Sequence, residues 1–310
     1  MIKKYKISVP KSTLNEIYKK VSKFPWSAAQ NMNGWEYGTN LNYLKSISKY
    51  WITKYNWKKF ENKINSFNNY KTKVEDINLH FIFEKSKNPN SKPLLLLHGW
   101  PGSITEFLDI IPRLAHPEKF GGKIEDGFDI VVPSLPGFGF SSQIKKALGP
   151  RKIGKILNKF MVKNLGYKNY FVQGGDWGAT IAGWIGLDSS KNCKGIHINC
   201  LPLRHPKGTK NVKEKKWEKK FNFDQIMQEG YRTQQATKPQ TLSYAMIDSP
   251  VGTAAWILEK FHGWSDLKMG KIEKTFSKDE LLSNIMIYII TKSFNTASSV
   301  SYTHLTLPTS

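Results

Sequence analysis

Apolar residues recur at helical spacing over the first part of the chain. Leu41, Leu44 and Ile47, for example, fall on one face of a helix. The repeat predicts three helices, at about 13–21, 41–51 and 57–67, the first opened by a capping box between Thr13 and Glu16. Two strands joined by a short polar turn are expected next, at 71–74 and 79–84.

From residue 91 the pattern changes to continuous apolar runs separated by helical stretches. The runs lie at 93–97, 128–132, 170–173 and 195–199. Such runs are typical of strands that are buried on both faces. The helical stretches lie near 104–114, near 153–165 and after Ala179. This alternation predicts a mostly parallel sheet with helices on both faces.

After Leu201 the alternation stops, and a charged, mostly helical region with aromatic residues extends to about Phe294. It fits a helical lid inserted above the sheet. Four regions are therefore expected: an N-terminal extension at 1–90, a core at 91–200, a lid and the start of the return to the core at 201–299, and a tail at 300–310. The tail, VSYTHLTLPT from Val300 to Thr309, has the character of a translated sequencing adapter and is expected to be non-native.

The composition is that of a soluble globular protein, with 39% hydrophobic and 23% charged residues among 310. The apolar runs are too short to span a bilayer. Only two cysteines are present, which weakly favours a reducing, intracellular compartment. We expect the chain in the cytoplasm; an N-terminal anchor upstream of it would imply the endoplasmic-reticulum membrane, and peripheral membrane association stays open.

The net charge of +23 raises the question of a nucleic-acid partner. Nucleic-acid recognition favours arginine, whose planar fork matches phosphates and base edges. Here only Arg113, Arg151, Arg204 and Arg232 are arginines, and the lysines are spread along the chain. We therefore expect no nucleic-acid partner.

The third buried run leads directly into Gly174-Gly175-Asp176-Trp177-Gly178. This has the form glycine–x–nucleophile–x–glycine between a strand and a helix, as a nucleophile elbow requires. Taken alone, the segment could also be a glycine-rich turn in which Asp176 caps the next helix. Its place after an earlier His-Gly-x-Pro loop favours the catalytic interpretation.

That earlier loop is His98-Gly99-Trp100-Pro101-Gly102. In such folds the backbone N–H groups of the residue after His-Gly and of the residue after the nucleophile form an oxyanion hole. The donors here are expected to be Trp100 and Trp177. We interpret His98 as a brace of the loop rather than as a catalytic base.

An aspartate nucleophile selects the class of reaction. A carboxylate is already ionised at neutral pH and suits displacement at a saturated carbon, so Asp176 disfavours serine and cysteine esterase chemistry. Epoxides and haloalkanes are the substrates that react in this way. An epoxide needs an acid such as a lid tyrosine, and a halide needs N–H donors, often from tryptophan. Both residue types are present, so the residues alone leave the two open.

Motifs along most of the chain resemble the microsomal-type epoxide hydrolases, including the juvenile hormone epoxide hydrolases, over about residues 4–299. The N-terminal signature is Gly34-Trp35-Glu36-Tyr37-Gly38. The core motifs are the two segments above and Pro133-Ser134-Leu135-Pro136-Gly137. The lid motifs are Thr237-Lys238-Pro239-Gln240-Thr241, Asp248-Ser249-Pro250-Val251-Gly252 and Glu259-Lys260-Phe261. The resemblance implies an α/β-hydrolase fold, Asp176 as nucleophile, and Tyr231 as one of two lid tyrosines that activate the epoxide oxygen.

The resemblance also implies a small hydrophobic epoxide as substrate, a vicinal diol as product, a role in detoxification or aromatic hydrocarbon catabolism, and no cofactor or metal. The family pattern breaks after Ser298-Ser299. Tyr302 comes one position earlier than the family's second tyrosine, and the arginine of the family pattern is lacking. The second tyrosine, the relay carboxylate and the histidine base are therefore expected to be absent, with His304 in the suspect tail. The sheet would be incomplete at its C-terminal side, and the chain would form an ester without turnover. A haloalkane dehalogenase-like hydrolase and a non-catalytic binder of hydrophobic ligands remain alternatives.

Overall fold

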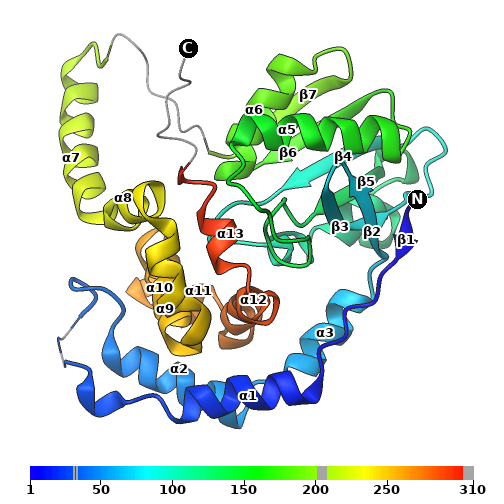
Figure 1. Ribbon diagram of the computed structural model, residues 1–310. Coiled ribbons are helices and arrows are strands. Elements are labelled where there is room, and N and C mark those ends of the chain that lie inside the picture. Colours follow the sequence, from blue (N-terminus) through cyan, green and yellow to red (C-terminus); the bar gives the residue numbers. More distant parts are fainter. Residues whose placement is uncertain (31, 33, 201–207, 303–310) are drawn as a thin grey trace.

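A computed structural model describes residues 1–30, 32, 34–200 and 208–302 (Figure 1). Its sheet has the order β1-β2-β3-β5-β4-β6-β7. The strands are β1 (Lys3–Lys4), β2 (Asn69–Val74), β3 (Ile77–Glu84), β4 (Lys92–Leu97), β5 (Phe128–Pro133), β6 (Tyr170–Gly174) and β7 (Cys193–Ile198). β4 to β7 pair in parallel, and β1 to β3 form an antiparallel extension that joins through β5. The predicted strands and the mostly parallel sheet are confirmed.

The helices surround the sheet and build a separate layer beside it (Figure 1). They are α1 (Lys11–Ser22), α2 (Leu41–Thr53), α3 (Trp57–Asn65), α4 (Ile111–Ala115), α5 (Pro150–Lys159), α6 (Trp177–Asp188), α7 (Val212–Gln228), α8 (Gly230–Thr237), α9 (Pro239–Asp248), α10 (Pro250–Gly263), α11 (Ile272–Thr275), α12 (Lys278–Thr291) and α13 (Phe294–Ser298). A 3₁₀ turn, η2 (Ile104–Phe107), precedes α4.

The crossovers decide which face of the sheet each core helix covers. The chain moves one way along the sheet from β4 to β5, and the opposite way from β5 to β6 and from β6 to β7. Right-handed crossovers therefore place α4 on one face and α5 and α6 on the other. In Figure 1, α5 and α6 lie in front of the strands. Helices on both faces explain why β4 and β5 are almost wholly buried.

Two local predictions are wrong. The helix expected at 104–114 is divided into η2 and α4, because Pro112 lacks an N–H group and fits only in the first turn of a new helix. The capping box between Thr13 and Glu16 does not form, since α1 already begins after Pro10 and Thr13 lies within its first turn. Pro10 already has a helical φ, so α1 begins at Lys11, before the predicted start at Thr13.

The N-terminal extension packs on the lid as well as on the core. Its helices α1 and α2 contact α10, and α2 and α3 contact α12. Hydrogen bonds join the same layers: Thr39 Oγ1 donates to the Ala255 carbonyl at 2.6 Å, and Tyr50 Oη donates to Asp279 at 2.9 Å. The strands of the extension thus continue the core sheet, whereas its helices pack against the lid.

Helix α12 lies between the extension and the core. All residues from Leu281 to Tyr288 are buried, including Ser283, Asn284 and Tyr288. A helix that is apolar around its whole circumference must be enclosed by other elements. The few polar groups on it therefore need partners inside the protein, and these partners lie in the functional site described below.

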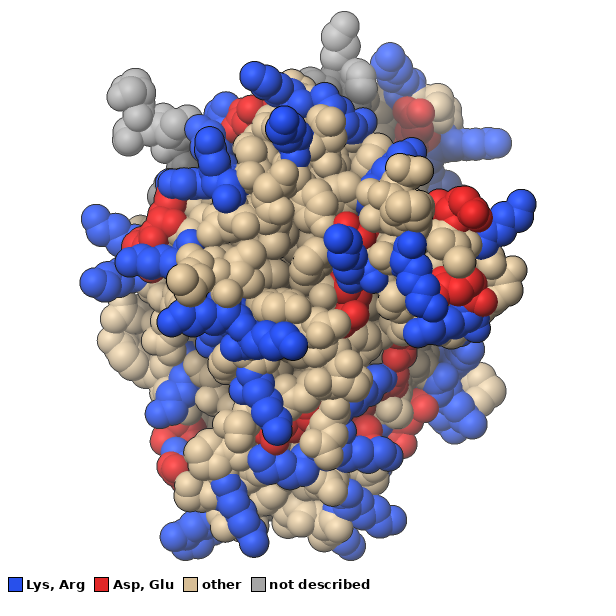
Figure 2. Space-filling view, turned by 90° about the vertical axis from the view of Figure 1, so that its right-hand side faces the viewer, with Lys and Arg blue, Asp and Glu red and all other residues tan. Residues whose placement is uncertain are grey.

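Basic side chains are scattered over the surface. Figure 2 shows Lys and Arg over one face, with Asp and Glu among them. Within the described ranges, no helix is long and apolar enough to cross a membrane. Of the expected tail, Val300 and Ser301 are buried and Tyr302 is 42% exposed. The rest of the tail, His304 included, and residues 201–207 lie outside the described residues.

A buried carboxylate fastens the start of the chain to α3. Glu61 is 5% exposed and accepts hydrogen bonds from the Val9 N–H at 2.8 Å and the Trp57 indole at 3.0 Å. Replacing Glu61 with Gln weakens charge-assisted bonds, so we expect a loss of about 2 kcal/mol in the free energy of unfolding by urea titration. Glu16→Gln, on the exposed side of α1, is the matched control and should change it by less than about 0.5 kcal/mol.

Candidate active site

Asp176 sits at the sharp turn between β6 and α6. Its backbone has φ 50° and ψ −126°, a conformation that non-glycine residues rarely adopt. It occupies the N-cap position of α6, but its side chain makes no capping hydrogen bond. The alternative in which Asp176 is only a helix cap is therefore wrong, and the side chain is available for another purpose.

Two glycines leave the space that this turn requires. A Cβ atom on Gly178 would collide with the Leu97 carbonyl, because α6 begins directly against the end of β4. A Cβ atom on Gly99 would collide with the Asp176 carboxylate. Side chains at either position would separate the elbow from the loop after β4.

The carboxylate of Asp176 lies among backbone donors. The Trp100 N–H donates to Asp176 Oδ1 at 2.8 Å, and the Trp177 N–H donates to the same carboxylate. Burial raises the pKa of Asp176 above its ordinary value, and these two hydrogen bonds oppose the shift. The two predicted donors thus converge on the predicted nucleophile; their function as an oxyanion hole stays a prediction.

His98 braces the loop at residues 98–103 by hydrogen bonds. The His98 Nδ1 lies 3.1 Å from the Gly99 carbonyl, and Nε2 accepts the Leu135 N–H at 3.2 Å. These partners require a neutral ring that donates through Nδ1. Burial lowers the pKa of His98 to about 4, so the ring stays neutral at physiological pH. The prediction that His98 braces the loop is confirmed.

Helix α12 holds the same loop from the other side. The Asn284 amide donates to the Pro101 carbonyl at 2.8 Å and accepts the Ser103 hydroxyl at 2.8 Å. The Tyr288 hydroxyl donates to the Gly102 carbonyl at 2.7 Å. These residues were not predicted. Their signal was the presence of polar residues, Asn284 and Tyr288 among them, in the mostly apolar segment from Leu281 to Tyr288.

Tyr231, on α8, packs against Trp100 of this loop. Its ring stacks on Trp100 with centroids 5.3 Å apart and planes 6° apart, and it meets Trp264 edge-on at 4.8 Å. Burial, then the charge of Asp176, raises the pKa of Tyr231, so its hydroxyl keeps its proton at neutral pH. Tyr231 thus stacks on the residue whose N–H binds Asp176, and its hydroxyl is close enough for the charge of Asp176 to act on it.

A buried lysine completes this aromatic cluster. Lys260 is 4% exposed, its ammonium lies 4.6 Å from the centre of the Tyr231 ring, and it pairs with Glu259. A desolvated ammonium over a ring face attracts the π electrons and fixes the ring. The sequence shows Lys260 only as one residue of a lid motif, because its burial depends on how α8 and α10 pack.

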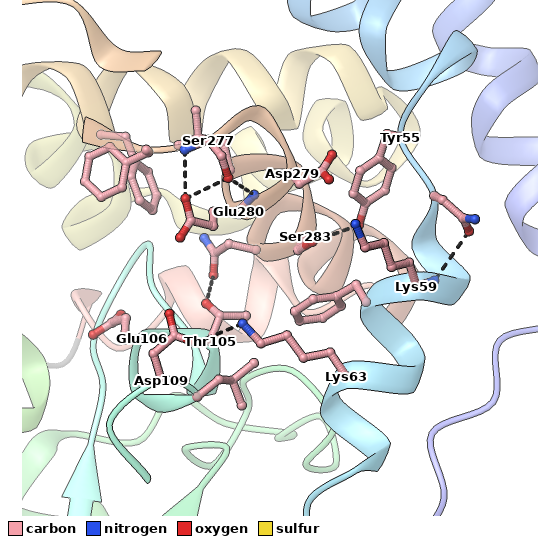
Figure 3. A pocket seen from close by; sticks show the side chains of 17 residues that line it. Tyr55, Lys59, Lys63, Thr105, Glu106, Asp109, Ser277, Asp279, Glu280 and Ser283 are labelled. Carbon is pink, nitrogen blue, oxygen red and sulfur yellow. Dashed lines mark hydrogen bonds and ion pairs between the residues drawn. The ribbon is translucent and has the colours of Figure 1, made fainter. Parts of the chain in front are cut away.

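A cavity of about 670 Å³ lies behind the loop, between α3, η2, α10 and α12. Figure 3 shows Glu106 and Thr105 of η2 on one side, residues of α12 across from them, and Tyr55, Lys59 and Lys63 on a third side. Its lining is mixed, with carboxylates, lysines and phenylalanines. Glu106 belongs both to this cavity and to the loop, since its carboxyl group lies against Gly102. Among the described residues, no group of three His, Cys, Asp or Glu side chains could hold a metal ion.

Known families match almost the whole chain. The family described as epoxide hydrolase N terminus matches residues 2–107, and the alpha/beta hydrolase fold matches residues 92–274. Epoxide hydrolase 1 of Oryctolagus cuniculus is 36% identical over 94% of this chain and 70% of its own length. Juvenile hormone epoxide hydrolase 2 of Ctenocephalides felis is 34% identical over 98% of this chain and 71% of its own length.

Solved structures agree in fold. The crystal structure of juvenile hormone epoxide hydrolase from Bombyx mori is similar with a TM-score of 0.88, at 30% identity, over 99% of this chain and 77% of that one. The structure of Aspergillus niger epoxide hydrolase has a TM-score of 0.85 at 26% identity, over 98% and 79%. The chain also spans 66% of a Stigmatella aurantiaca relative to which it is 39% identical.

The brace from α12 can be tested by removing one hydroxyl. Tyr288→Phe leaves the buried Gly102 carbonyl without its donor, so we expect a loss of about 1–3 kcal/mol in the free energy of unfolding, measured by urea titration. Tyr244→Phe is the control, since Tyr244 is 67% exposed and its hydroxyl accepts only from Gln240. Equal effects of the two substitutions would contradict the role of Tyr288 as a brace.

Proposed function

Since the chain belongs to the epoxide hydrolase family, in which an N-terminal region precedes an α/β-hydrolase domain, we propose that it converts an epoxide and water to a vicinal diol. The observation that carries the proposal is the carboxylate of Asp176, which accepts the N–H of Trp100 at 2.8 Å, the residue on whose ring Tyr231 stacks. The charge of Asp176 acts on the Tyr231 hydroxyl, which supports the two groups as nucleophile and acid of one site.

In the first step, a carboxylate oxygen of Asp176 attacks a ring carbon of the epoxide. A carbon–oxygen ester bond forms, the ring carbon–oxygen bond breaks, and its electron pair stays on the ring oxygen. Tyr231 donates its proton to this oxygen, giving a hydroxyl. The aromatic surroundings, Trp100, Tyr231 and Trp264, favour a small hydrophobic epoxide.

In the second step, water must attack the ester carbonyl, whose oxyanion the N–H groups of Trp100 and Trp177 would stabilise. Water needs a base for this attack. His80 and His98 use both ring nitrogens in other hydrogen bonds, and His262 stacks on Trp35. None of the histidines in the described ranges hydrogen-bonds to Asp176, so we expect the ester to accumulate.

One observation favours a second candidate, displacement of a halide. The Trp100 indole nitrogen is buried and has no hydrogen-bond partner among the described residues. An indole N–H of this kind could hold a leaving halide. The stacking of Tyr231 on the same ring favours the epoxide, because halide displacement needs no acid.

The proposal predicts a covalent intermediate. After incubation with styrene oxide, the intact mass should rise by the mass of one epoxide, because the reaction is an addition without a leaving group. Peptide mapping should place the adduct on Asp176, and Asp176→Asn should give none. Asp248→Asn, which alters an exposed carboxylate paired with Lys20, is the control and should form the adduct normally. Sustained diol release without an adduct would contradict the scheme.

Tyr231→Phe separates the two candidate reactions. Loss of the acid should slow ester formation from styrene oxide at least about 10-fold, measured as adduct mass against time. Ester formation from a 1-bromoalkane, followed as bromide release, should not change. Slowing of both reactions to the same extent would indicate that the substitution disturbs the stack on Trp100 instead of removing an acid.

A further inference from the structure

Glu106 is a second carboxyl group at the catalytic loop, and the proposed reaction does not use it. Its carboxyl end lies where a side chain on Gly102 would project, two residues from the N–H that binds Asp176. The rest of its side chain lines the cavity behind the loop (Figure 3). Glu106 therefore has Asp176 on one side and a route to solvent on the other.

A structural role explains part of this arrangement. The Glu106 carboxyl accepts the backbone N–H of Ser103, the residue that opens η2, as in a capping box. Ser277 and Glu280 make the same contact at the start of α12, at 2.7 Å. Glu280 also borders the cavity, so the chain contains a matched capping glutamate that is not placed at the loop.

The hydrogen-bond donors are shared unequally between the two acids at the loop. Asp176 accepts from two backbone N–H groups, of Trp100 and Trp177, and Glu106 from one, of Ser103. Two carboxylates close together repel each other and do not readily ionise together. Asp176, which accepts more hydrogen bonds, is then the anion, and Glu106 keeps its proton.

Burial, then the charge of Asp176, raises the pKa of Glu106 to about 8. The residue is nevertheless exposed toward the cavity, and water there weakens the effect of burial. The pKa of Glu106 therefore lies above its ordinary value of 4.5. The other charged or titratable groups that face it are Tyr288 of α12, whose pKa is raised by burial and then by Glu106, and, around the cavity, Lys59, Lys63, Asp109, Asp279 and Glu280. Lys63 is paired with Asp109, and Asp279 accepts from Tyr50.

We propose that Glu106 is a positioning residue that holds a proton while Asp176 is ionised, so that the catalytic loop carries one negative charge, on the nucleophile. The claim about the nucleophile rests on the proposed function. The proton on Glu106 exchanges with solvent through the cavity, without passage through the substrate site. At high pH Glu106 ionises, and its charge acts on Asp176 through the loop.

The first test needs no reaction. Between about 4.5 and the raised pKa, folded protein binds a proton on Glu106 that unfolded protein lacks, so stability falls as the pH rises through this window. Glu106→Gln keeps the capping contact but cannot titrate. We expect the difference between the melting temperatures of the wild type and of Glu106→Gln to change across this window, with the wild type losing stability as the pH rises. Below and above the window the difference should be constant. A difference that is constant at all pH values would overturn the proposal, since a cap alone gives that result.

The coupling to Asp176 is tested by repeating the comparison in Asp176→Asn. Loss of the neighbouring anion should move the upper end of the window to lower pH. An unmoved window would overturn the coupling. Glu280→Gln is the matched control and should show no such window. If Glu106→Gln does not fold, the titration can be followed by the infrared carbonyl band of the protonated carboxyl. The band is measured against pH in the wild type and in Asp176→Asn, and the pH at which it disappears should be lower in Asp176→Asn.

The second test uses ester formation from styrene oxide. As Asp176 attacks, its charge moves toward the epoxide oxygen and away from Glu106, so an ionised Glu106 destabilises the starting carboxylate more than the transition state. The ratio of wild-type to Glu106→Gln rates should be near one at about pH 6 and rise severalfold above about pH 8. A rate increase in Glu106→Gln at neutral pH would mean that Glu106, not Asp176, is the anion. Absence of any adduct in the wild type would instead refute the proposed function, and leaves the stability test unaffected.

Discussion

The backbone of Asp176, with φ 50° and ψ −126°, is the constraint on which the rest of the site depends. Such a conformation costs about 1–3 kcal/mol and persists only where the surroundings fix it. Here β6 is paired on both sides, with β4 and with β7, and α6 begins against the end of β4. The turn cannot relax without separating strands, so the carboxylate stays raised above the sheet. Its bond to the Trp100 N–H then fixes the position of the Trp100 ring, on which Tyr231 stacks.

The loop that supplies this N–H is itself an irregular segment, and a buried loop needs partners for its carbonyl groups. Asn284 and Tyr288 provide them from α12. The same helix contacts the N-terminal extension, where Tyr55 and Ser283 share a hydrogen bond of 3.1 Å. The extension therefore acts on the site through α12: it encloses an apolar helix whose polar groups fix the loop. This explains how residues far from Asp176 in sequence support its geometry.

The features that could be predicted from the sequence are those with a local signal. The strands follow from apolar runs, and the elbow from its glycines and its place after a strand. Pro112 is a local signal too, for the break between η2 and α4, although the apolar spacing around it matches one continuous helix. The partner of the extension could not be predicted, because apolar faces on α1 and α2 do not specify what covers them. The braces on α12 depend on contacts across more than a hundred residues, and the environment of Lys260 depends on Tyr231, which lies on another helix.

Glu106 illustrates the same limit for chemistry. Ser103 and Glu106 have the spacing of a capping box, and that local signal describes a helix start and nothing more. The significance of Glu106 arises from the fold, which brings the start of η2 to the elbow after β6. A carboxyl placed close to another makes it harder for both to be ionised at once. The donors decide which of them is the anion: two N–H groups at Asp176 against one at Glu106. The reactivity of the nucleophile is therefore a property of the loop and the elbow together, and not of the elbow motif alone.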